Sequence, residues 1–376
     1  MLKKIITIGI ILFLLMISFS SVSVGINLQS IKLNNISLQQ KDTNLDDFTV
    51  ETYKISTQDK SSITLTRYNG IKRPSIMLVH GMSVNHKIFD WDNNHSLARF
   101  LNKEGWDVWM LDLRTHDGDG DFIFLKNSDR EYINRYWDFD KTLLKIDVVT
   151  AVDFIKEKSE NDSIYFLGHS YGGYLAYAYA ELIGEENLSG IITTGSSAMS
   201  TYVPTPLYKN FKYGIKIGNK VFVNPIGLRR SHLSYLLIQM LIKNLEGSSN
   251  GIFYNNTTPS YIKKEFVYSF DDEPAGVYVD MIFGKDQRLY GEHWVDPQTL
   301  YDYTANLNKI TVPSLLLVGD EDSDDPMKDV YKTYENISSI NKKFLHFAEH
   351  GHLDLLLGDN SSTLIFPEIN NWLNSL

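Results

Sequence analysis

The chain contains no cysteine, and this absence excludes three kinds of chemistry. With none among 376 residues, the protein has no disulfides, no zinc thiolate site and no cysteine nucleophile. Positive charge is also scarce, because 36 Lys and Arg residues stand against 46 Asp and Glu residues, for a formal net charge of -10. Phosphate binding needs clustered Lys and Arg, so we expect no nucleic-acid partner.

The amino-terminal residues differ from the rest of the chain. Lys3 and Lys4 precede an uncharged apolar run from Ile5 to Phe19, which the small residues SSVSVG follow. This order of a basic, an apolar and a small-residue segment predicts a secretory signal over residues 1–25.

Cleavage of this segment is expected after Ser23 or Gly25. An uncleaved membrane anchor is the alternative, because no charge follows until Lys32 and the uncharged run is long enough to span a bilayer. Either reading places the rest of the protein outside the cytoplasm, secreted or membrane-anchored. The polar residues 26–46 are expected to form a linker.

Hydrophobic patterning beyond the linker alternates between strands and helices. Helical spacing of apolar residues covers residues 96–104 and 139–158. Apolar or alternating runs predict strands at residues 50–55, 62–68, 74–81, 107–114, 163–168, 190–195, 313–320 and 342–347. Strands that alternate with helices indicate an α/β fold, with a mostly parallel sheet and helices on both faces. In such a sheet, ligands bind beyond the carboxyl ends of the strands.

A serine stands at one of these strand ends. In Gly168-His169-Ser170-Tyr171-Gly172, an apolar strand gives way at once to a helix rich in alanine and tyrosine. Glycine two residues before and two after the serine removes Cβ atoms where so sharp a turn is crowded. We therefore interpret Ser170 as a strained nucleophile whose helix points N–H groups at developing negative charge. A purely structural serine is the alternative.

Acidic residues and histidines follow other strands at the same edge. The acidic run begins Asp320-Glu321-Asp322, the final strand precedes His350-Gly351-His352, and His80-Gly81-Met82 follows the first buried strand. Serine, acid and histidine thus occur in the order that one large family of hydrolases uses.

The serine motif resembles the nucleophile elbow of the α/β-hydrolase fold, and the resemblance extends from about Val50 to the carboxyl terminus. That family's acid pattern, Gly-x-x-Asp-x-x-x-Pro, implies Asp322, with Asp320 as its rival. The pattern Gly-His-x-Asp implies His352, with His350 as its rival. The neighbouring Asp324 and Asp325 are expected to be solvated or to cap a helix.

Within this fold, three stretches are similar to the acid lipases of the gastric and lysosomal type. They are LVHGMSVNHKIF, FLGHSYGG and HLDLLLG. The chain differs from that branch at Tyr171, where the family usually has Gln, and in having no cysteine.

The resemblance implies acyl transfer to water. His352 takes the proton of Ser170, and Asp322 orients the imidazole. The backbone N–H groups of Tyr171 and Met82 form the oxyanion hole.

Three further features complete the site that the resemblance implies. His80 and Gly81 are expected to shape the oxyanion loop rather than react. The run from His116 to Asp121 has the look of a calcium loop. It lacks the required Gly and Glu, so a solvated loop is the better interpretation. No cofactor and no metal is expected.

Residues 196–308 are too many for an ordinary connection between a strand and the next one. They are expected to form a cap or lid on a hydrolase core made of residues 47–195 and 309–376. Within the cap, an apolar helical face over residues 232–245 could line a pocket for an acyl group or contact a membrane.

The sequence therefore predicts an exported serine hydrolase that cleaves carboxylic esters, with a small-molecule or lipid ester as substrate. Membrane association through the amino-terminal segment or the cap is an accompanying hypothesis. Peptidase or acyltransferase activity on the same triad is one alternative, because a triad is indifferent to the leaving group. A catalytically silent module that binds a lipid or a partner is the other.

Overall fold

The computed structural model describes residues 49–70, 73–82, 84–114, 116, 137–199, 252–254, 257–269, 271 and 275–376. The chain divides into two compact units, residues 1–47 and 48–376, and all described residues belong to the second. Four predictions lie outside the described residues: the signal or anchor, the linker, the acidic run after His116 and the helix over residues 232–245.

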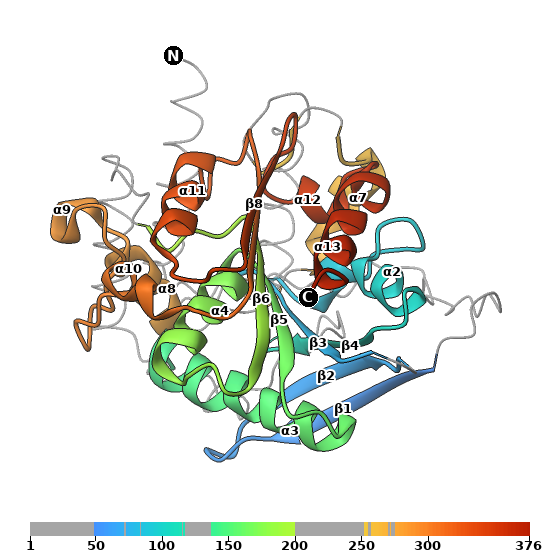
Figure 1. Ribbon diagram of the computed structural model, residues 1–376, viewed down its shortest axis with the longest axis horizontal. Coiled ribbons are helices and arrows are strands. Elements are labelled where there is room, and N and C mark those ends of the chain that lie inside the picture. Colours follow the sequence, from blue (N-terminus) through green and yellow to red (C-terminus); the bar gives the residue numbers. More distant parts are fainter. Residues whose placement is uncertain are drawn as a thin grey trace, which may run out of the picture. The chain divides into compact units, whose positions relative to one another are not determined.

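An eight-stranded sheet forms the centre of this unit, in the order β1-β2-β4-β3-β5-β6-β7-β8 (Figure 1). Among the strand pairs of this described sheet, β1–β2 and β2–β4 are antiparallel and the other five are parallel. The predicted mostly parallel sheet is therefore confirmed. The strands are β1 (Val50–Ser56), β2 (Ser62–Tyr68), β3 (Ser75–Val79), β4 (Asp107–Asp112), β5 (Ile164–His169), β6 (Leu188–Thr194), β7 (Ser314–Gly319) and β8 (Lys342–Phe347).

The central strands are apolar on both sides because both faces of the sheet are covered. Met77 and Val79 of β3 pack into one buried cluster, whereas Ile76 and Leu78 pack into a second one. This arrangement explains the continuous apolar runs in the sequence.

Helices on each face enclose these two clusters (Figure 1). On the first face lie η3 (Phe139–Val148), α3 (Val149–Ser159), α4 (Tyr171–Leu182) and α11 (Met327–Asn336). On the second face lie η1 (His86–Phe89), α2 (Leu97–Lys103), α12 (Asp354–Leu357), η6 (Ser361–Ile365) and α13 (Phe366–Leu373).

The two core helices predicted from apolar spacing are present, and each begins at a side-chain cap. The Ser96 hydroxyl accepts the Arg99 N–H at 3.0 Å before α2. The Asp138 carboxylate accepts two N–H groups at the start of η3, whose ten residues have wider π-helical turns and continue directly into α3. Gly105 follows α2 with φ +95°, a conformation that favours glycine.

The long segment between β6 and β7 includes several short helices in its described part. They are α7 (Ser260–Glu265), η4 (Phe266–Ser269), α8 (Ala275–Gly284), α9 (Gln287–Tyr290), α10 (Tyr303–Asn306) and η5 (Leu307–Lys309). Trp294 joins this segment to the first face of the sheet. Its ring stacks on Tyr303 at 4.0 Å between centroids and meets Phe139 at 5.2 Å and Tyr174 at 5.4 Å.

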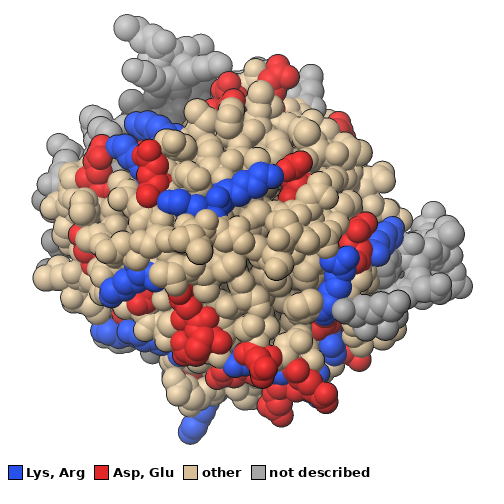
Figure 2. Space-filling view, in the orientation of Figure 1, with Lys and Arg blue, Asp and Glu red and all other residues tan. Residues whose placement is uncertain are grey.

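Charged side chains of both signs are interspersed over the face in Figure 2, and acidic ones gather near its lower edge. Among the surface ion pairs, Lys343 Nζ lies 2.9 Å from Glu368 Oε2. Within the described part of the chain, every helix is too short or too polar to cross a membrane.

Replacing Trp294 with Ala should lower the free energy of unfolding by about 3–5 kcal/mol, because it leaves a cavity among buried rings. Urea unfolding of the two proteins measures this difference. Ile340, which is fully exposed, provides the control, and Ile340→Ala should change stability by no more than about 0.5 kcal/mol. Equal effects of the two substitutions would contradict the packing role of Trp294.

Candidate active site

Ser170 lies in the turn between β5 and α4 with φ 53° and ψ -118°. A residue other than glycine in this region stores about 1–3 kcal/mol of strain. A Cβ atom at Gly168 would collide with the backbone of Gly172, and one at Gly172 would collide with the carbonyl oxygen of Val79. The two glycines therefore permit the turn in the way the sequence predicted.

Hydrogen bonds on both sides hold the backbone of Ser170. Its N–H donates to the Thr194 carbonyl at 2.9 Å, which ties the turn to β6. Its carbonyl accepts the Ser196 hydroxyl at 2.9 Å and the N–H groups of Gly173 and Tyr174. The strained conformation is thus fixed by its surroundings before any substrate binds.

The predicted histidine and acid are in direct contact. His352 Nδ1 lies 2.7 Å from Asp322 Oδ2, and both side chains are buried. The other Asp322 oxygen accepts the backbone N–H groups of Asp324 and Asp325, each at 2.9 Å. Because an ionised carboxylate can only accept, the shared proton belongs to Nδ1, which leaves Nε2 as the basic atom of the ring.

Burial and charge act in opposite directions on this imidazole. Burial alone would lower the pKa of His352, but the Asp322 carboxylate stabilises the protonated ring and raises that pKa above its ordinary value. Burial also raises the pKa of Asp322, and the facing histidine offsets part of that effect. The pair is thus suited to accept and hold a proton.

Three close approaches bring the serine, the histidine and the predicted oxyanion loop, residues 80–82, to the same strand ends. The His169 ring, next to Ser170, lies 4.7 Å from the His352 ring. A Cβ atom at Gly195 would come within 2.9 Å of both His352 Nδ1 and Asp322 Oδ2. A Cβ atom at Gly81 would lie 3.3 Å from the Cβ of Ser170.

The rival residues have other partners. Asp320 Oδ1 lies 2.7 Å from His346 Nδ1 at the exposed end of β8. His350 contacts the Ala348 carbonyl at 2.7 Å through Nδ1 and Asn360 at 2.9 Å through Nε2. Both rivals are therefore engaged away from the contact between His352 and Asp322.

Asp325 corrects one prediction from the sequence. It was expected to be solvated or to cap a helix, but its side chain is 1% exposed. The residue before α11 is Pro326 and no side-chain cap is made there. Asp325 is buried because a lysine and a tyrosine distant in sequence surround its carboxylate.

The loop that holds His352 is fixed by Asp354, the last residue of the Gly-His-x-Asp motif, to which the sequence assigned no role. Its carboxylate accepts the Gly351 N–H at 2.8 Å, the Thr258 hydroxyl at 2.5 Å and the Tyr254 N–H at 2.5 Å. Two of these donors come from the segment between β6 and β7. The motif Gly-His-x-Asp was the available signal, since an acid two residues after a histidine can bind the loop's own backbone.

His80 braces the oxyanion loop as a neutral ring. Its Nδ1 lies 2.8 Å from the Gly81 carbonyl, and its Nε2 accepts the Leu113 N–H at 3.3 Å. Complete burial, together with the nearby His116, lowers the pKa of His80 to about 3. His80 therefore remains uncharged at neutral pH. Met82, the last residue of this loop, is half-buried against the core.

Two polar pairs hold the chain beyond Met82. The buried Asp112 accepts both the backbone N–H of His86, at 2.8 Å, and its Nδ1, at 2.6 Å. The Asn85 amide donates to Asp271 at 2.7 Å, and the Asn85 N–H donates to the Ser269 carbonyl at 3.0 Å. The oxyanion loop is thus bound to β4 on one side and to the inserted segment on the other.

A strained serine, a buried histidine–acid pair and a parallel sheet define the class of α/β serine hydrolases. A family model described as the alpha/beta hydrolase fold matches residues 74–359. The chain belongs to this family.

Comparison with curated proteins finds lipases. Mouse gastric triacylglycerol lipase is 24% identical over 322 residues, which are 79% of this chain and 80% of that protein. Human lysosomal acid lipase/cholesteryl ester hydrolase is 23% identical over 359 residues, covering 86% of this chain and 87% of the relative. The similarity to acid lipases predicted from three short stretches is confirmed.

Solved structures with the same fold include esterases. A thermophilic esterase from Thermogutta terrifontis aligns with a TM-score of 0.58 at 17% identity, over 86% of this chain and 98% of that one. An esterase from Exiguobacterium antarcticum aligns with a TM-score of 0.57 at 17% identity, over 85% and 98%. At these identities the structures establish the fold.

The pair formed by His86 and Asp112 should make stability depend on pH. Burial alone would lower the pKa of His86 and raise that of Asp112, but each charge reverses the effect on its partner, so the His86 pKa is raised and the Asp112 pKa is lowered. Because its pKa is raised on folding, His86 stabilises the fold below about pH 6.5. That contribution is lost as the pH rises through the folded-state pKa of His86. Because its pKa is lowered on folding, Asp112 stabilises the fold above about pH 4. That contribution is lost as the pH falls through the folded-state pKa of Asp112.

His86→Gln should therefore lower the free energy of unfolding most, by about 1–3 kcal/mol, between pH 4.5 and 6, and progressively less toward pH 9. Urea unfolding at a series of pH values measures this. His293→Gln is the control, because that histidine meets Asp302 at the surface. A deficit for His86→Gln that does not change with pH would refute the ion pair.

Proposed function

We propose that the protein is an exported carboxylic ester hydrolase that works through Ser170, His352 and Asp322. Ester hydrolysis is supported by the lipase and esterase relatives. The proposed triad is supported above all by the 2.7 Å contact between His352 Nδ1 and Asp322 Oδ2 beside a strained serine. A protein without catalytic work would have no physical need for that strain.

The proposed reaction starts with the His352 proton on Nδ1 and with Nε2 free to accept one. As Ser170 Oγ attacks the ester carbonyl carbon, its proton moves to His352 Nε2, and Asp322 stabilises the resulting imidazolium. The tetrahedral intermediate collapses, the C–O bond to the alcohol breaks, and His352 returns the proton to the leaving oxygen. Water then attacks the acyl-enzyme by the same proton route, which releases the acid and restores Ser170.

The negative oxygen of the intermediate is proposed to accept the backbone N–H groups of Tyr171 and Met82. Tyr171 is the first residue of α4, whose positive dipole end faces the serine. Gly81, directly before Met82, packs against the Ser170 side chain. His80 keeps this loop in place by its two hydrogen bonds.

Residues 196–308 are proposed to act as a cap that selects the ester. The described part of this segment is bonded to two loops of the site. The Ser269 carbonyl accepts the Asn85 N–H at 3.0 Å, and the Ile252 carbonyl accepts the Leu353 N–H at 2.9 Å. An apolar acyl group as substrate is supported by the lipase relatives.

Ser170→Ala should lower kcat for p-nitrophenyl esters by roughly 10⁴ to 10⁶. The measurement compares residues 27–376 with and without the substitution, over acyl chains from acetate to palmitate. The chain length with the highest Ser170-dependent rate separates an esterase from a lipase.

Ser338→Ala, at an exposed position, is the matched control and should retain the wild-type rate. A fluorophosphonate should label the wild-type protein and the control but not Ser170→Ala. Labelling without turnover of any ester would favour a peptidase or acyltransferase instead. A wild-type protein that neither reacts with the label nor turns over an ester would overturn the proposal in favour of a silent binding module.

Export is proposed from residues 1–25, whose basic, apolar and small-residue segments follow one another as in secretory signals. One of the relatives is named a lysosomal lipase, which is compatible with a protein that leaves the cytoplasm. Membrane association, through this segment or through the apolar residues 232–245, belongs to the same proposal.

The full chain, expressed with its own amino terminus, should be found outside the cytoplasm. Intact mass then decides between two forms: loss of residues 1–23 or 1–25 indicates cleavage, and an intact chain in the membrane fraction indicates an anchor. Full-length protein in the cytoplasm would overturn export. Flotation of the mature chain with liposomes tests membrane binding. If the mature chain does not float, membrane binding through the cap is excluded.

A further inference from the structure

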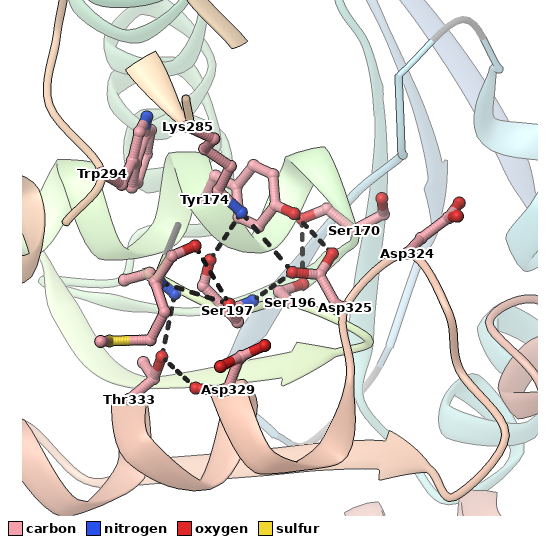
Figure 3. Close-up of polar contacts among 12 residues, drawn as sticks. Ser170, Tyr174, Ser196, Ser197, Lys285, Trp294, Asp324, Asp325, Asp329 and Thr333 are labelled. Atoms are coloured by element: carbon pink, nitrogen blue, oxygen red, sulfur yellow. Dashed lines mark hydrogen bonds and ion pairs between the residues drawn. The ribbon is translucent and has the colours of Figure 1, made fainter. Parts of the chain in front are cut away.

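A buried ion pair lies next to the proposed triad. Lys285 Nζ is 3.6 Å from Asp325 Oδ1, and these side chains are 5% and 1% exposed. Lys285 follows α8 in the segment between β6 and β7, whereas Asp325 belongs to the loop after β7 that also holds Asp322. Figure 3 shows the lysine approaching Asp325 from the side opposite to α11.

The lysine is held by oriented contacts on several sides. Its Nζ donates to the Ser197 carbonyl at 2.9 Å and lies 3.7 Å from the centroid of the Tyr174 ring (Figure 3). Burial lowers the pKa of Lys285, while the charge of Asp325 opposes that effect. The Tyr174 ring also favours a cation at this position.

Asp325 connects the lysine to the triad acid through its own peptide group. Its carboxylate accepts the Ser197 N–H at 3.0 Å and the Tyr174 hydroxyl (Figure 3). Its backbone N–H donates to Asp322 Oδ1 at 2.9 Å. Asp322 Oδ2 in turn lies 2.7 Å from His352 Nδ1. A continuous path of polar contacts therefore runs from Lys285 to the histidine.

Stability alone does not account for this arrangement. A buried ion pair pays a large desolvation cost, and well-packed apolar residues of similar size are often as stable or more stable. Without a cation, Asp322 and Asp325 would be two buried carboxylates on one short loop beside a single imidazole. Such a pair of like charges would favour protonation of that imidazole.

We propose that Lys285 is a positioning residue for the triad, which neutralises Asp325 and fixes the loop that presents Asp322 to His352. This inference rests on the proposed function of Ser170. It assigns the segment between β6 and β7 a part in the chemistry in addition to substrate selection.

The charged groups around each member give the direction of the effect. His352 faces Asp322, Asp324, Asp325 and the neutral His169 ring, while Lys285 faces Asp325 and Asp329. Burial lowers the pKa of His352, Asp322 raises it, and the negative charges of Asp324 and Asp325 raise it further. Because only the deprotonated histidine can act as base, the cation of Lys285 favours activity at lower pH by opposing Asp325.

The test is the pH dependence of kcat/KM for one p-nitrophenyl ester, which reports the free enzyme's histidine. Lys285→Met should move the acid limb to higher pH, by on the order of one pH unit. Asp325→Asn should move it to lower pH. Lys285→Arg, which keeps the charge, should restore the wild-type position. Lys332→Met is the matched control, because that exposed lysine pairs with Glu292 on the surface, and it should leave the profile unchanged.

The outcomes separate a positioning role of Lys285 from a purely structural one. A purely structural lysine would lower kcat/KM by the same factor at every pH and leave the acid limb in place, and that result overturns the inference. If Lys285→Met does not fold, Asp325→Asn and Lys285→Arg still test it, because no shift in the former or a shift in the latter contradicts the charge pair. If Ser170→Ala is inactive but the pH profiles of Lys285→Met and Asp325→Asn are unshifted, only the positioning role is refuted. If Ser170→Ala remains active, the proposed function itself is refuted.

Discussion

The close approach of α4 to the strands before it is the constraint on which the rest of the site depends. Because Gly172 lies against the Val79 carbonyl and Gly168 against Gly172, the helix begins as soon as β5 ends. Ser170 is left at the turn with positive φ. Any larger residue at these glycines would push α4 away from β3 and with it the oxyanion loop. The serine's strain is thus a property of how tightly the sheet and helix pack.

Most of the fold could be predicted because its signals are local. Continuous apolar runs such as β3 and β7 mark strands covered on both faces, and their buried side chains alternate between two clusters. The helix that begins after Ser96 follows from a cap and a spacing visible within ten residues. The meeting of an acid and a histidine was predictable because the topology brings the loops after β7 and β8 to one edge of the sheet. The choice of Asp322 over Asp320 and of His352 over His350 came from the patterns of the family that the chain resembles.

The features that the sequence did not predict depend on distant partners. Asp325 stands in an acidic run that suggests solvation, yet its carboxylate is buried by a tyrosine 151 residues earlier and by Lys285. Nothing around Lys285 in the sequence indicates that it is buried, because only the folded segment places it over Tyr174. Likewise, His116 was expected to begin a solvated loop, whereas it is buried and its ring lies 4.6 Å from that of His80. Periodicity contains no information on such pairings.

The segment between β6 and β7 contacts each of the three loops that hold the proposed site residues. Ser269 and Asp271 bind Asn85, which follows the oxyanion loop. Lys285 pairs with Asp325 on the loop that holds Asp322. Thr258 donates to Asp354, which fixes the loop that holds His352. The segment that is proposed to select the ester is therefore bonded to the loops that hold the proposed catalytic residues. A substitution that reshapes it for a new acyl group also acts on these contacts. Changes in substrate preference and changes in the geometry of the triad should consequently be coupled in this enzyme.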